Sequence, residues 1–390
     1  MTGRREMKPG TIEAVDKMTP HRERTRRVMV GDVPIGGGAR IAIQSMTLSS
    51  PTNVGASVEE IQRLGEAGAE IVRTAVPSDE AAAALPELVR HSPVPLVADI
   101  HFNYRLAIKA AEAGVAKLRL NPGNIGKAER VRAVVDAARE RGLPIRVGVN
   151  AGSLERDLLA KYGHPTAQAM VESARRHVRI LEDEGFEDIV ISLKSSRVPL
   201  MIAAYRLAAQ EFPYPLHLGV TEAGTPRAGN IKSAVGIGTL LAEGIGDTLR
   251  VSLSADPVEE VHAARTILES LDLRRESIQI VACPGCGRLQ VDLIRLAEEV
   301  EERTRSIRKP LTVAVMGCAV NGPGEAREAD IGIAGGKGEG LLYVRGEMAR
   351  KVPESKIVDA LLELIEEVEP DADRAPRSAD GITFTPDWEG

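Results

Sequence analysis

Short apolar, β-branched runs alternate with Ala-, Leu-, Glu- and Arg-rich segments of helical period across residues 41–271. This alternation predicts strands that are each followed by a helix, the pattern of a parallel sheet. The runs that predict strands number eight: Ile41–Met46, Ile71–Val76, Pro95–Ile100, Ala116–Leu120, Ile145–Val149, Asp188–Leu193, Leu216–Val220 and Thr248–Leu253.

Helical segments separate these strands, and several end in a glycine suited to the left-handed cap of a helix. They include Ser57–Ala67, Tyr104–Ala113, Ala128–Arg141, Ala167–Glu184, Ile231–Glu243 and, after the last strand, Val258–Leu271. Ser57 and Glu60 have the spacing of a capping box. Eight strand–helix units predict an α/β fold of the (β/α)8 TIM-barrel type. A doubly wound open sheet is the alternative, and it accounts less well for eight regular units.

The length of 390 residues favours two domains, because one hydrophobic core rarely supports so long a chain. After residue 273 the strand–helix rhythm stops, and a small α+β domain is expected. Its predicted strands are 278–282, 311–316, 331–334 and 341–344, with helices at 289–305 and 355–369. The predicted organisation is a basic N-terminal arm (1–27), the barrel (28–273), the α+β domain (274–369) and a polar, disordered or loosely docked tail (370–390).

Charge and composition narrow the possible partners. The net charge is −6 and aromatic residues make up 3% of the chain, which argues against a nucleic-acid or anionic-membrane surface. The sequence has neither an apolar run long enough to span a bilayer nor the apolar segment of a signal peptide. Its three cysteines fit a reducing compartment in which thiols bind metals, so a cytoplasmic protein is expected.

All the cysteine of the chain lies in Cys283-Pro-Gly-Cys286 and at Cys318, each segment following an apolar run. Such an arrangement can close three thiolates around one metal centre, and thiolates select iron–sulfur clusters, zinc or copper(I). The fourth ligand of an iron–sulfur cube would be Glu325, on the Gly/Pro-rich loop after Cys318. A displaceable carboxylate corner would let such a cluster bind substrate. A structural zinc, a thioredoxin-like redox pair and inert buried thiols remain open alternatives.

Polar residues stand where nearly every barrel strand ends, the place where TIM barrels form their active sites. Four arginines and a lysine are among them: Arg73, Arg119, Arg146, Arg250 and Lys194. Because residues two apart in a strand share a face, these cations can converge on one mouth, where they would repel each other unless they met a polyanion. A diphosphate fits this requirement. The alternative is ordinary ion pairing with Asp99, Glu222 or other acids, and His101 alone is ambiguous.

Several motifs in these regions resemble one family, the 4-hydroxy-3-methylbut-2-enyl diphosphate synthases of the non-mevalonate isoprenoid pathway, in their two-domain form. The resemblance covers residues 26–366. Its most specific motifs are Gln44-Ser-Met-Thr47, Leu118-Arg-Leu-Asn-Pro-Gly-Asn-Ile125, Cys283-Pro-Gly-Cys-Gly-Arg288, Met316-Gly-Cys-Ala-Val-Asn-Gly-Pro-Gly-Glu-Ala326 and Asp330-Ile-Gly-Ile-Ala-Gly-Gly336.

The resemblance implies an iron–sulfur oxidoreductase with a [4Fe-4S] cluster held by Cys283, Cys286, Cys318 and Glu325. It implies reductive ring opening of 2-C-methyl-D-erythritol 2,4-cyclodiphosphate to (E)-4-hydroxy-3-methylbut-2-enyl diphosphate. The implied substrate ligands are Arg73, Arg119, Asn121, Arg146, Asn150, Lys194, Arg250 and Ser252. Asp99, His101 and Glu222 would line the reacting end, with Glu222 as the candidate proton donor.

The same resemblance implies flavodoxin or ferredoxin as the electron donor and a head-to-tail homodimer in which the cluster domain of one subunit caps the barrel of the other. Two rival functions stay open on the residues alone. One is a lyase or isomerase barrel that acts on a phosphorylated substrate and carries a structural zinc. The other is a non-catalytic iron–sulfur sensor.

Overall fold

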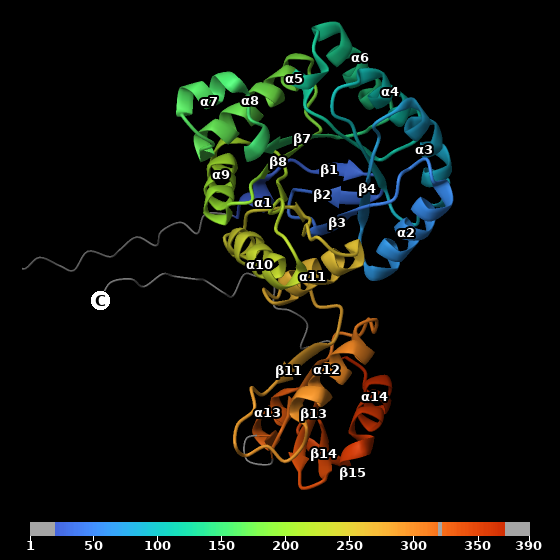
Figure 1. Cartoon of the computed structure of the whole chain (residues 1–390), viewed down its shortest axis with the longest axis vertical. Helices are drawn as coiled ribbons and strands as arrows, with labels where there is room; N and C mark the ends of the chain where they lie inside the picture. The colour runs from blue at the N-terminus through green and yellow to red at the C-terminus, as the bar shows by residue number, and fades with distance from the viewer. Residues whose placement is uncertain (1–19, 319–321, 371–390) are drawn as a thin grey trace, which may run out of the picture. The chain divides into compact units, whose positions relative to one another are not determined.

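The computed structural model describes residues 20–318 and 322–370, which form two compact units with a boundary between Ile267 and Leu268 (Figure 1). The predictions for residues 1–19 of the arm and 371–390 of the tail lie outside the described residues. None of the described helices is long and apolar enough to cross a membrane.

The first unit is built on eight parallel strands in the order β8-β7-β6-β5-β4-β3-β10-β9. A bridge between Ile191 and Leu216 joins the two ends of this order, so the sheet closes on itself and the predicted TIM barrel is confirmed. The strands are β3 (Ala42–Met46), β4 (Ile71–Ala75), β5 (Leu96–Asp99), β6 (Lys117–Arg119), β7 (Ile145–Asn150), β8 (Ile189–Lys194), β9 (His217–Leu218) and β10 (Thr248–Leu249).

Helices surround these strands (Figure 1). They are α2 (Val54–Ala67), α3 (Asp79–His91), α4 (Tyr104–Glu112), α5 (Pro122–Ile125), α6 (Ala128–Glu140), α7 (Arg156–Tyr162), α8 (Ala167–Asp183), α9 (Val198–Glu211), α10 (Pro226–Ala242) and α11 (Pro257–Glu269). The closing seam between β8 and β9 is reinforced by Tyr205 of α9. Its buried hydroxyl accepts the Leu193 N–H at 3.0 Å and donates to the His217 carbonyl at 2.5 Å.

The predicted capping box at the start of α2 is wrong. The helix begins three residues earlier, and the Asn53 side chain caps it by accepting the Ala56 N–H. The Glu60 carboxylate instead accepts the N–H groups of Leu48 and Ser49, both at 2.9 Å, in the loop that follows β3. Glu60, which has the spacing of a helix cap, thus forms a tertiary contact with the end of a strand instead.

The N-terminal residues of the first unit close one end of the barrel. The hairpin of β1 (Val28–Val30) and β2 (Val33–Ile35) packs Val28, Val30 and Ile35 against residues early in the barrel strands, namely Ala42, Ile71, Val97 and Val190. His21 of α1 (His21–Arg24) and Thr25, both placed in the arm by the sequence analysis, are buried. The Thr25 hydroxyl donates to the Asp247 carboxylate at 2.9 Å. This end of the barrel interior is therefore apolar and filled.

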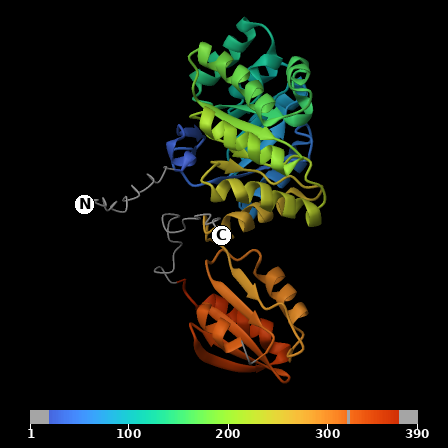
Figure 2. The same cartoon turned by 90° about the vertical axis from the view of Figure 1, so that its left-hand side faces the viewer.

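The second unit (orange to red in Figure 2) has a five-stranded sheet in the order β11-β12-β13-β14-β15. Strands β11 (Gln279–Ala282), β12 (Thr312–Met316) and β13 (Ile331–Gly336) are parallel, whereas β14 (Glu339–Val344) and β15 (Glu347–Pro353) run antiparallel. Val313, Ile333 and Leu342 of the sheet form one core with Leu296 of α12 (Leu293–Thr304) and Leu361 of α14 (Ile357–Glu367).

Two elements of the second unit differ from the sequence predictions. Strand β15 was not predicted, because its side chains are largely exposed and it lacks the apolar signal of a buried strand. The Gly/Pro-rich loop predicted to carry Glu325 contains the short helix α13 (Gly322–Glu328), with Glu325 exposed in its first turn. Proline is compatible with the first turn of a helix, where its missing N–H would have no helical partner.

Candidate functional site

Strand alternation directs a set of charged side chains to the end of the barrel interior opposite the hairpin. Ile71 and Val97 contact the hairpin, so Arg73 and Asp99, two residues further along, face the same interior. On β8, Lys194 lies four residues after Val190, which contacts the hairpin, and so faces the same interior. We call this group the mouth cluster and include in it the deeper side chains of Lys117 and His217 and the Glu260 carboxylate of α11. It consists of Arg73, Asp99, Lys117, Arg119, Arg146, Lys194, His217, Arg250 and Glu260.

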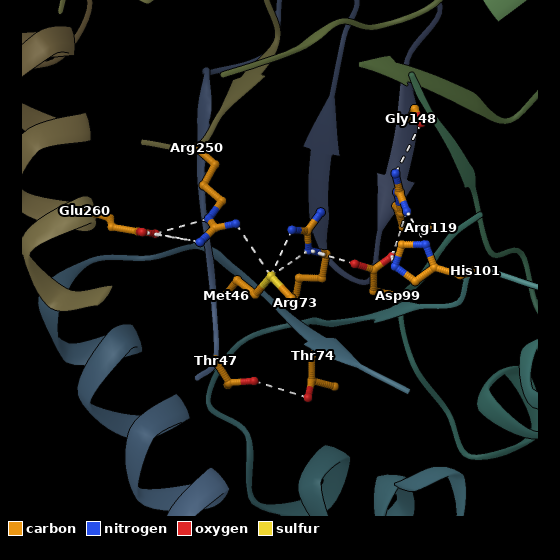
Figure 3. A network of polar contacts seen from close by, with 10 residues as sticks. All are labelled: Met46, Thr47, Arg73, Thr74, Asp99, His101, Arg119, Gly148, Arg250 and Glu260. Carbon is orange, nitrogen blue, oxygen red and sulfur yellow. Dashed lines mark hydrogen bonds and ion pairs between the residues drawn. The ribbon is translucent and has the colours of Figure 1, made fainter. Parts of the chain in front are cut away.

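Asp99 is the counterion of one side of the mouth cluster (Figure 3). Its carboxylate lies 3.1 Å from Arg119 Nη1 and 3.6 Å from Arg73 Nε. Burial opposes its ionisation, but Arg73 and Arg119 outweigh that effect and lower the pKa of Asp99 below its usual value. His101 is 60% exposed, with Nε2 3.9 Å from Asp99 and Nδ1 3.5 Å from Arg119. Asp99 is thus held as a carboxylate.

Glu260 of α11 is the counterion of the opposite side. Arg250 donates from Nε to one of its carboxylate oxygens at 3.1 Å and from Nη2 to the other at 3.3 Å. The Met46 sulfur lies between the two sides, 2.8 Å from Arg73 Nη2 and 3.5 Å from Arg250 Nη1 (Figure 3). Burial raises the pKa of Glu260, although Arg250 acts against that effect.

The centre of the mouth cluster contains cations that no carboxylate of the described residues contacts. Lys117 Nζ and the Nε and Nη1 of Arg146 are buried and have no hydrogen-bond partner among the described residues, and the same holds for His217 Nε2. Burial, followed by the repulsion of neighbouring cations, lowers the pKa values of Lys117, Arg146, Lys194 and His217 well below their usual ranges. Buried charge of one sign without counterions is costly unless an anion completes it.

The predicted site residues that carry amide, hydroxyl or carboxylate groups differ from one another in exposure and in hydrogen bonding. The side-chain amide of Asn121 donates from Nδ2 to the Gly148 carbonyl at 2.9 Å, and its Oδ1 accepts the Gly148 N–H at 2.8 Å. This side chain therefore braces β6 against β7. Asn150 and Ser252 are half-buried near the ends of β7 and β10. Glu222 is exposed, has a left-handed backbone (φ 52°) and takes no part in the network around Asp99 and Glu260.

Three members of the mouth cluster were not predicted as site residues: Lys117, His217 and Glu260. Lys117 lies two residues before Arg119 and His217 two residues before Gly219, so strand alternation alone places each on an inward face. Glu260 carried a weaker signal, an acid near the start of the helix that follows the eighth strand. Its role depends on a tertiary contact that spacing does not reveal.

The three cysteines lie near one edge of the sheet in the second unit. Cys283 follows β11 and Cys318 follows its parallel neighbour β12, and the Gly317 N–H donates to Cys283 Sγ at 3.5 Å. The Gly317 carbonyl accepts the Gln290 N–H, which ties the Cys-Pro-Gly-Cys turn to the same point. A Cβ at Gly317 would lie 2.2 Å from a Leu289 methyl, so a larger residue here would displace the Leu289 side chain.

The donor types at this edge fit an iron–sulfur centre. All three thiols are free, Cys286 is exposed, and hydrogen bonds from the backbone and side chain of Arg288 lower its pKa toward the thiolate form that binds metals. Within residues 20–318 and 322–370, however, no three Cys, His, Asp or Glu side chains converge on one point that could hold a metal ion. The three thiols therefore have the chemistry of iron–sulfur ligands and lie near one edge of the sheet. Within the described residues they do not form a closed ligand cage.

The fold and these two sites define a TIM-barrel protein with a cationic mouth and a second, thiol-bearing α+β unit. The family model described as the GcpE TIM-barrel domain matches residues 25–265, and that of the GcpE protein C-terminal domain matches residues 279–367. The chain therefore belongs to the GcpE family, and the family resemblance found in the sequence motifs is confirmed.

Curated relatives support the same assignment. A protein of Geobacter sulfurreducens is 60% identical over 345 residues, which cover 88% of this chain and 98% of the relative. Proteins of Clostridium perfringens (58%) and Bacillus licheniformis (57%) align over 89% of this chain and 100% and 94% of their own lengths. All three are named 4-hydroxy-3-methylbut-2-en-1-yl diphosphate synthase (flavodoxin).

Among solved structures, the 7,8-dihydropteroate synthase of Vibrio fischeri ES114 aligns with 64% of this chain and 99% of its own at a TM-score of 0.46 and 10% identity. This likeness is too weak to bear on function.

Proposed function

We propose that the chain catalyses the two-electron reductive ring opening of 2-C-methyl-D-erythritol 2,4-cyclodiphosphate to (E)-4-hydroxy-3-methylbut-2-enyl diphosphate in isoprenoid precursor biosynthesis. The relatives named as synthases of this product, at 57–60% identity, support the reaction. One structural observation carries the proposal: the buried cations of the mouth cluster exceed the carboxylates that contact them. A diphosphate would supply the missing negative charge.

The substrate would bind through the cations and the nearby polar side chains. No carboxylate of the described residues contacts Arg146 or Lys194, so both would meet the diphosphate oxygens directly. Arg73, Arg119 and Arg250 each keep a carboxylate partner, which fixes their planes while N–H groups remain for the ligand. Asn150 and Ser252 add further donors, whereas the amide of Asn121 would act mainly by holding Gly148 in place.

We further propose that Cys283, Cys286, Cys318 and Glu325 hold a [4Fe-4S] cluster, with Glu325 as the ligand that gives way to substrate. The shared sheet edge, the free thiols and the lowered pKa of Cys286 support this donor set. When bound, such a cluster supplies electrons and a Lewis acid for loss of the hydroxyl group.

Cleavage of the C–O bond requires a proton, and the residues differ in their ability to give one. The pKa of Asp99 is lowered by Arg73 and Arg119, so its carboxylate holds no proton to donate near neutral pH. Asp99 is instead suited to orient those two guanidinium groups and His101. We therefore assign the proton donor to Glu222, which is exposed on the loop after β9, with His101 as a residue that lines the reacting end.

The names of the relatives support flavodoxin as the electron donor. The proposal also includes a head-to-tail homodimer, in which the cluster domain of one subunit lies over the barrel of the other. A cytoplasmic location is proposed as well, because a reducing compartment keeps thiols free to bind metal. Mixed dimers of Cys318→Ala and Lys194→Ala chains test the arrangement. Recovery of activity on mixing is expected, and its complete absence would contradict capping between subunits.

The reaction itself is tested by anaerobic purification, followed by turnover of the cyclic diphosphate with reduced flavodoxin. A brown protein with broad absorbance near about 400 nm that forms the allylic diphosphate is expected. A colourless zinc protein would contradict the proposal and favour a lyase or isomerase. A coloured protein inert toward the substrate would favour an iron–sulfur sensor.

A further inference from the structure

Glu260 is a buried acid that the substrate-binding set does not include, yet it contacts two parts of that set. Its side chain is 4% exposed and lies in the first turn of α11, outside the barrel strands. Arg250 reaches it through two nitrogen atoms, at 3.1 and 3.3 Å. A guanidinium held at two points by one carboxylate is fixed in its plane as well as its position.

The same carboxylate also fixes the backbone that follows β10. Glu260 Oε1 accepts the Leu253 N–H at 2.9 Å, next to Ser252. One side chain thus restrains both Arg250 and the peptide that carries Ser252, the two predicted ligands after the eighth strand. The Met46 sulfur, 3.5 Å from Arg250 Nη1, limits the guanidinium on its other side (Figure 3).

We propose that Glu260 is a positioning residue, which acts through Arg250 and the Ser252 backbone to align one phosphate of the substrate for ring opening. The inference rests on the proposed function, since it assigns a task within that reaction. Glu260 would bind no substrate itself, because its carboxylate would repel a phosphate.

Removal of its charge should therefore separate affinity from turnover. Glu260→Gln keeps the shape of the side chain but releases the guanidinium from its two-point contact and removes a competing negative charge. Binding of inorganic diphosphate should then be as tight as in the wild-type protein, or tighter. Turnover should fall by about 10- to 100-fold, the loss expected when a reacting group is displaced by about 1 Å.

The pH profile supplies a readout that a purely structural role would not change. The charged groups that act on Glu260 are Arg250 of the β10 end, Lys194 of β8 and Arg73 of β4. Burial raises the pKa of Glu260, so its carboxyl group takes up a proton as pH falls and loses an acceptor for Arg250. The wild-type kcat should fall on this acidic limb, and Glu260→Gln should lack that part of the fall.

The experiment compares the cluster-loaded wild-type enzyme with Glu260→Gln, Arg250→Gln and the double variant. Glu184→Gln is the matched control, because Arg132 donates to Glu184 at 2.9 and 3.3 Å on the outer surface of the barrel. The measurements are kcat for the cyclic diphosphate, the Kd of inorganic diphosphate by calorimetry, and the thermal unfolding midpoint.

We expect Glu184→Gln to match the wild type and Glu260→Gln to lose turnover without losing diphosphate affinity. In the Arg250→Gln background, Glu260→Gln should cause no comparable further loss, since both act through one contact. Wild-type kcat in Glu260→Gln, or an equal further loss in the double variant, would overturn the inference. If the wild-type enzyme itself fails to convert the cyclic diphosphate, the proposed function fails instead.

Discussion

The mouth cluster of the barrel and the thiol-bearing edge of the second unit differ in how far the protein fixes them in advance. At the mouth, strand register places buried cations together. Asp99 forms ion pairs with Arg73 and Arg119, and Glu260 forms one with Arg250. At the thiol edge, Cys286 is exposed on a turn and Glu325 on a short helix, and no ligand cage is closed among the described residues. The mouth side chains are therefore held in place by one another, whereas the described part of the thiol edge is open.

This difference agrees with the chemistry of the two ligands. A diphosphate must find several donors at once, and preformed donors avoid the cost of ordering long Arg and Lys side chains on binding. A metal cluster forms strong bonds to thiolates and can draw them together as it assembles. The following variants test whether the two sites are as separable as this comparison requires.

The largest effect is expected for Cys318→Ser. Loss of one of three thiolates should prevent stable cluster binding and lower turnover by more than about 100-fold, a loss larger than that caused by changes around intact ligands. Binding of the cyclic diphosphate to the barrel should remain within about twofold of wild type, well below 1 kcal/mol. Absorbance near about 400 nm measures cluster binding, and calorimetry measures binding of the cyclic diphosphate. A coloured, active Cys318→Ser enzyme would contradict the ligand assignment.

A smaller loss is expected for Glu325→Cys, which offers the cluster a fourth thiolate. The cluster should survive, and its colour should resist dilution better than that of the wild type. Turnover should fall by about tenfold or more, since a thiolate corner yields less readily to substrate than a carboxylate corner. Full turnover in this variant would show that ligand release is unnecessary.

In the mouth, Lys117→Met should stabilise the fold. Lys117 is buried and has no hydrogen-bond partner in residues 20–318 and 322–370. An apolar side chain of similar size avoids its desolvation cost, so a gain of about 1–4 kcal/mol is expected at pH 7. Because burial lowers its folded-state pKa, the unfolded chain binds one more proton between that pKa and about 10.5. Wild-type stability should therefore rise with pH in this window.

The excess unfolding free energy of Lys117→Met over the wild type should therefore shrink as pH rises through this window, by about 1 kcal/mol per pH unit. Urea unfolding at two alkaline pH values measures this difference. An advantage that stays constant with pH would show that Lys117 keeps its proton in the folded protein.

The smallest effect on function is expected for Tyr205→Phe, at the seam between β8 and β9. The variant leaves the Leu193 N–H without its acceptor and should cost about 1–3 kcal/mol of unfolding free energy. Diphosphate affinity should stay unchanged, because the mouth cluster keeps its other supports. A large loss of affinity instead would show that the mouth depends on this seam.

The sequence predicted most of the barrel because its signals are local. Apolar, β-branched strand runs alternate with segments of helical period, so position along the chain is enough to find eight units. The same alternation brought Arg73, Arg119, Arg146 and Lys194 to one interior. Membership of the GcpE family could also be recognised from motifs around the cysteines and strand ends.

What the sequence missed depends on contacts between distant segments. Glu60 has the spacing of a helix cap, yet it binds the loop after β3. Asn121 has the position of a ligand, yet the nitrogen and the oxygen of its side-chain amide both pair with the Gly148 backbone. Glu260 lies outside every motif, and its partner Arg250 becomes apparent only once α11 packs beside β10. Side-chain partners of this kind are set by tertiary packing, which no local spacing encodes.

The most direct test of the account is binding of the cyclic diphosphate to protein from which the iron has been removed. Calorimetry should show one site per chain, weakened by salt, in cluster-free wild-type protein, with Arg146→Met binding about 10- to 100-fold more weakly through loss of one charge-assisted contact. This result would establish that the mouth is formed before the cluster. Absence of binding until the cluster is rebuilt would contradict it.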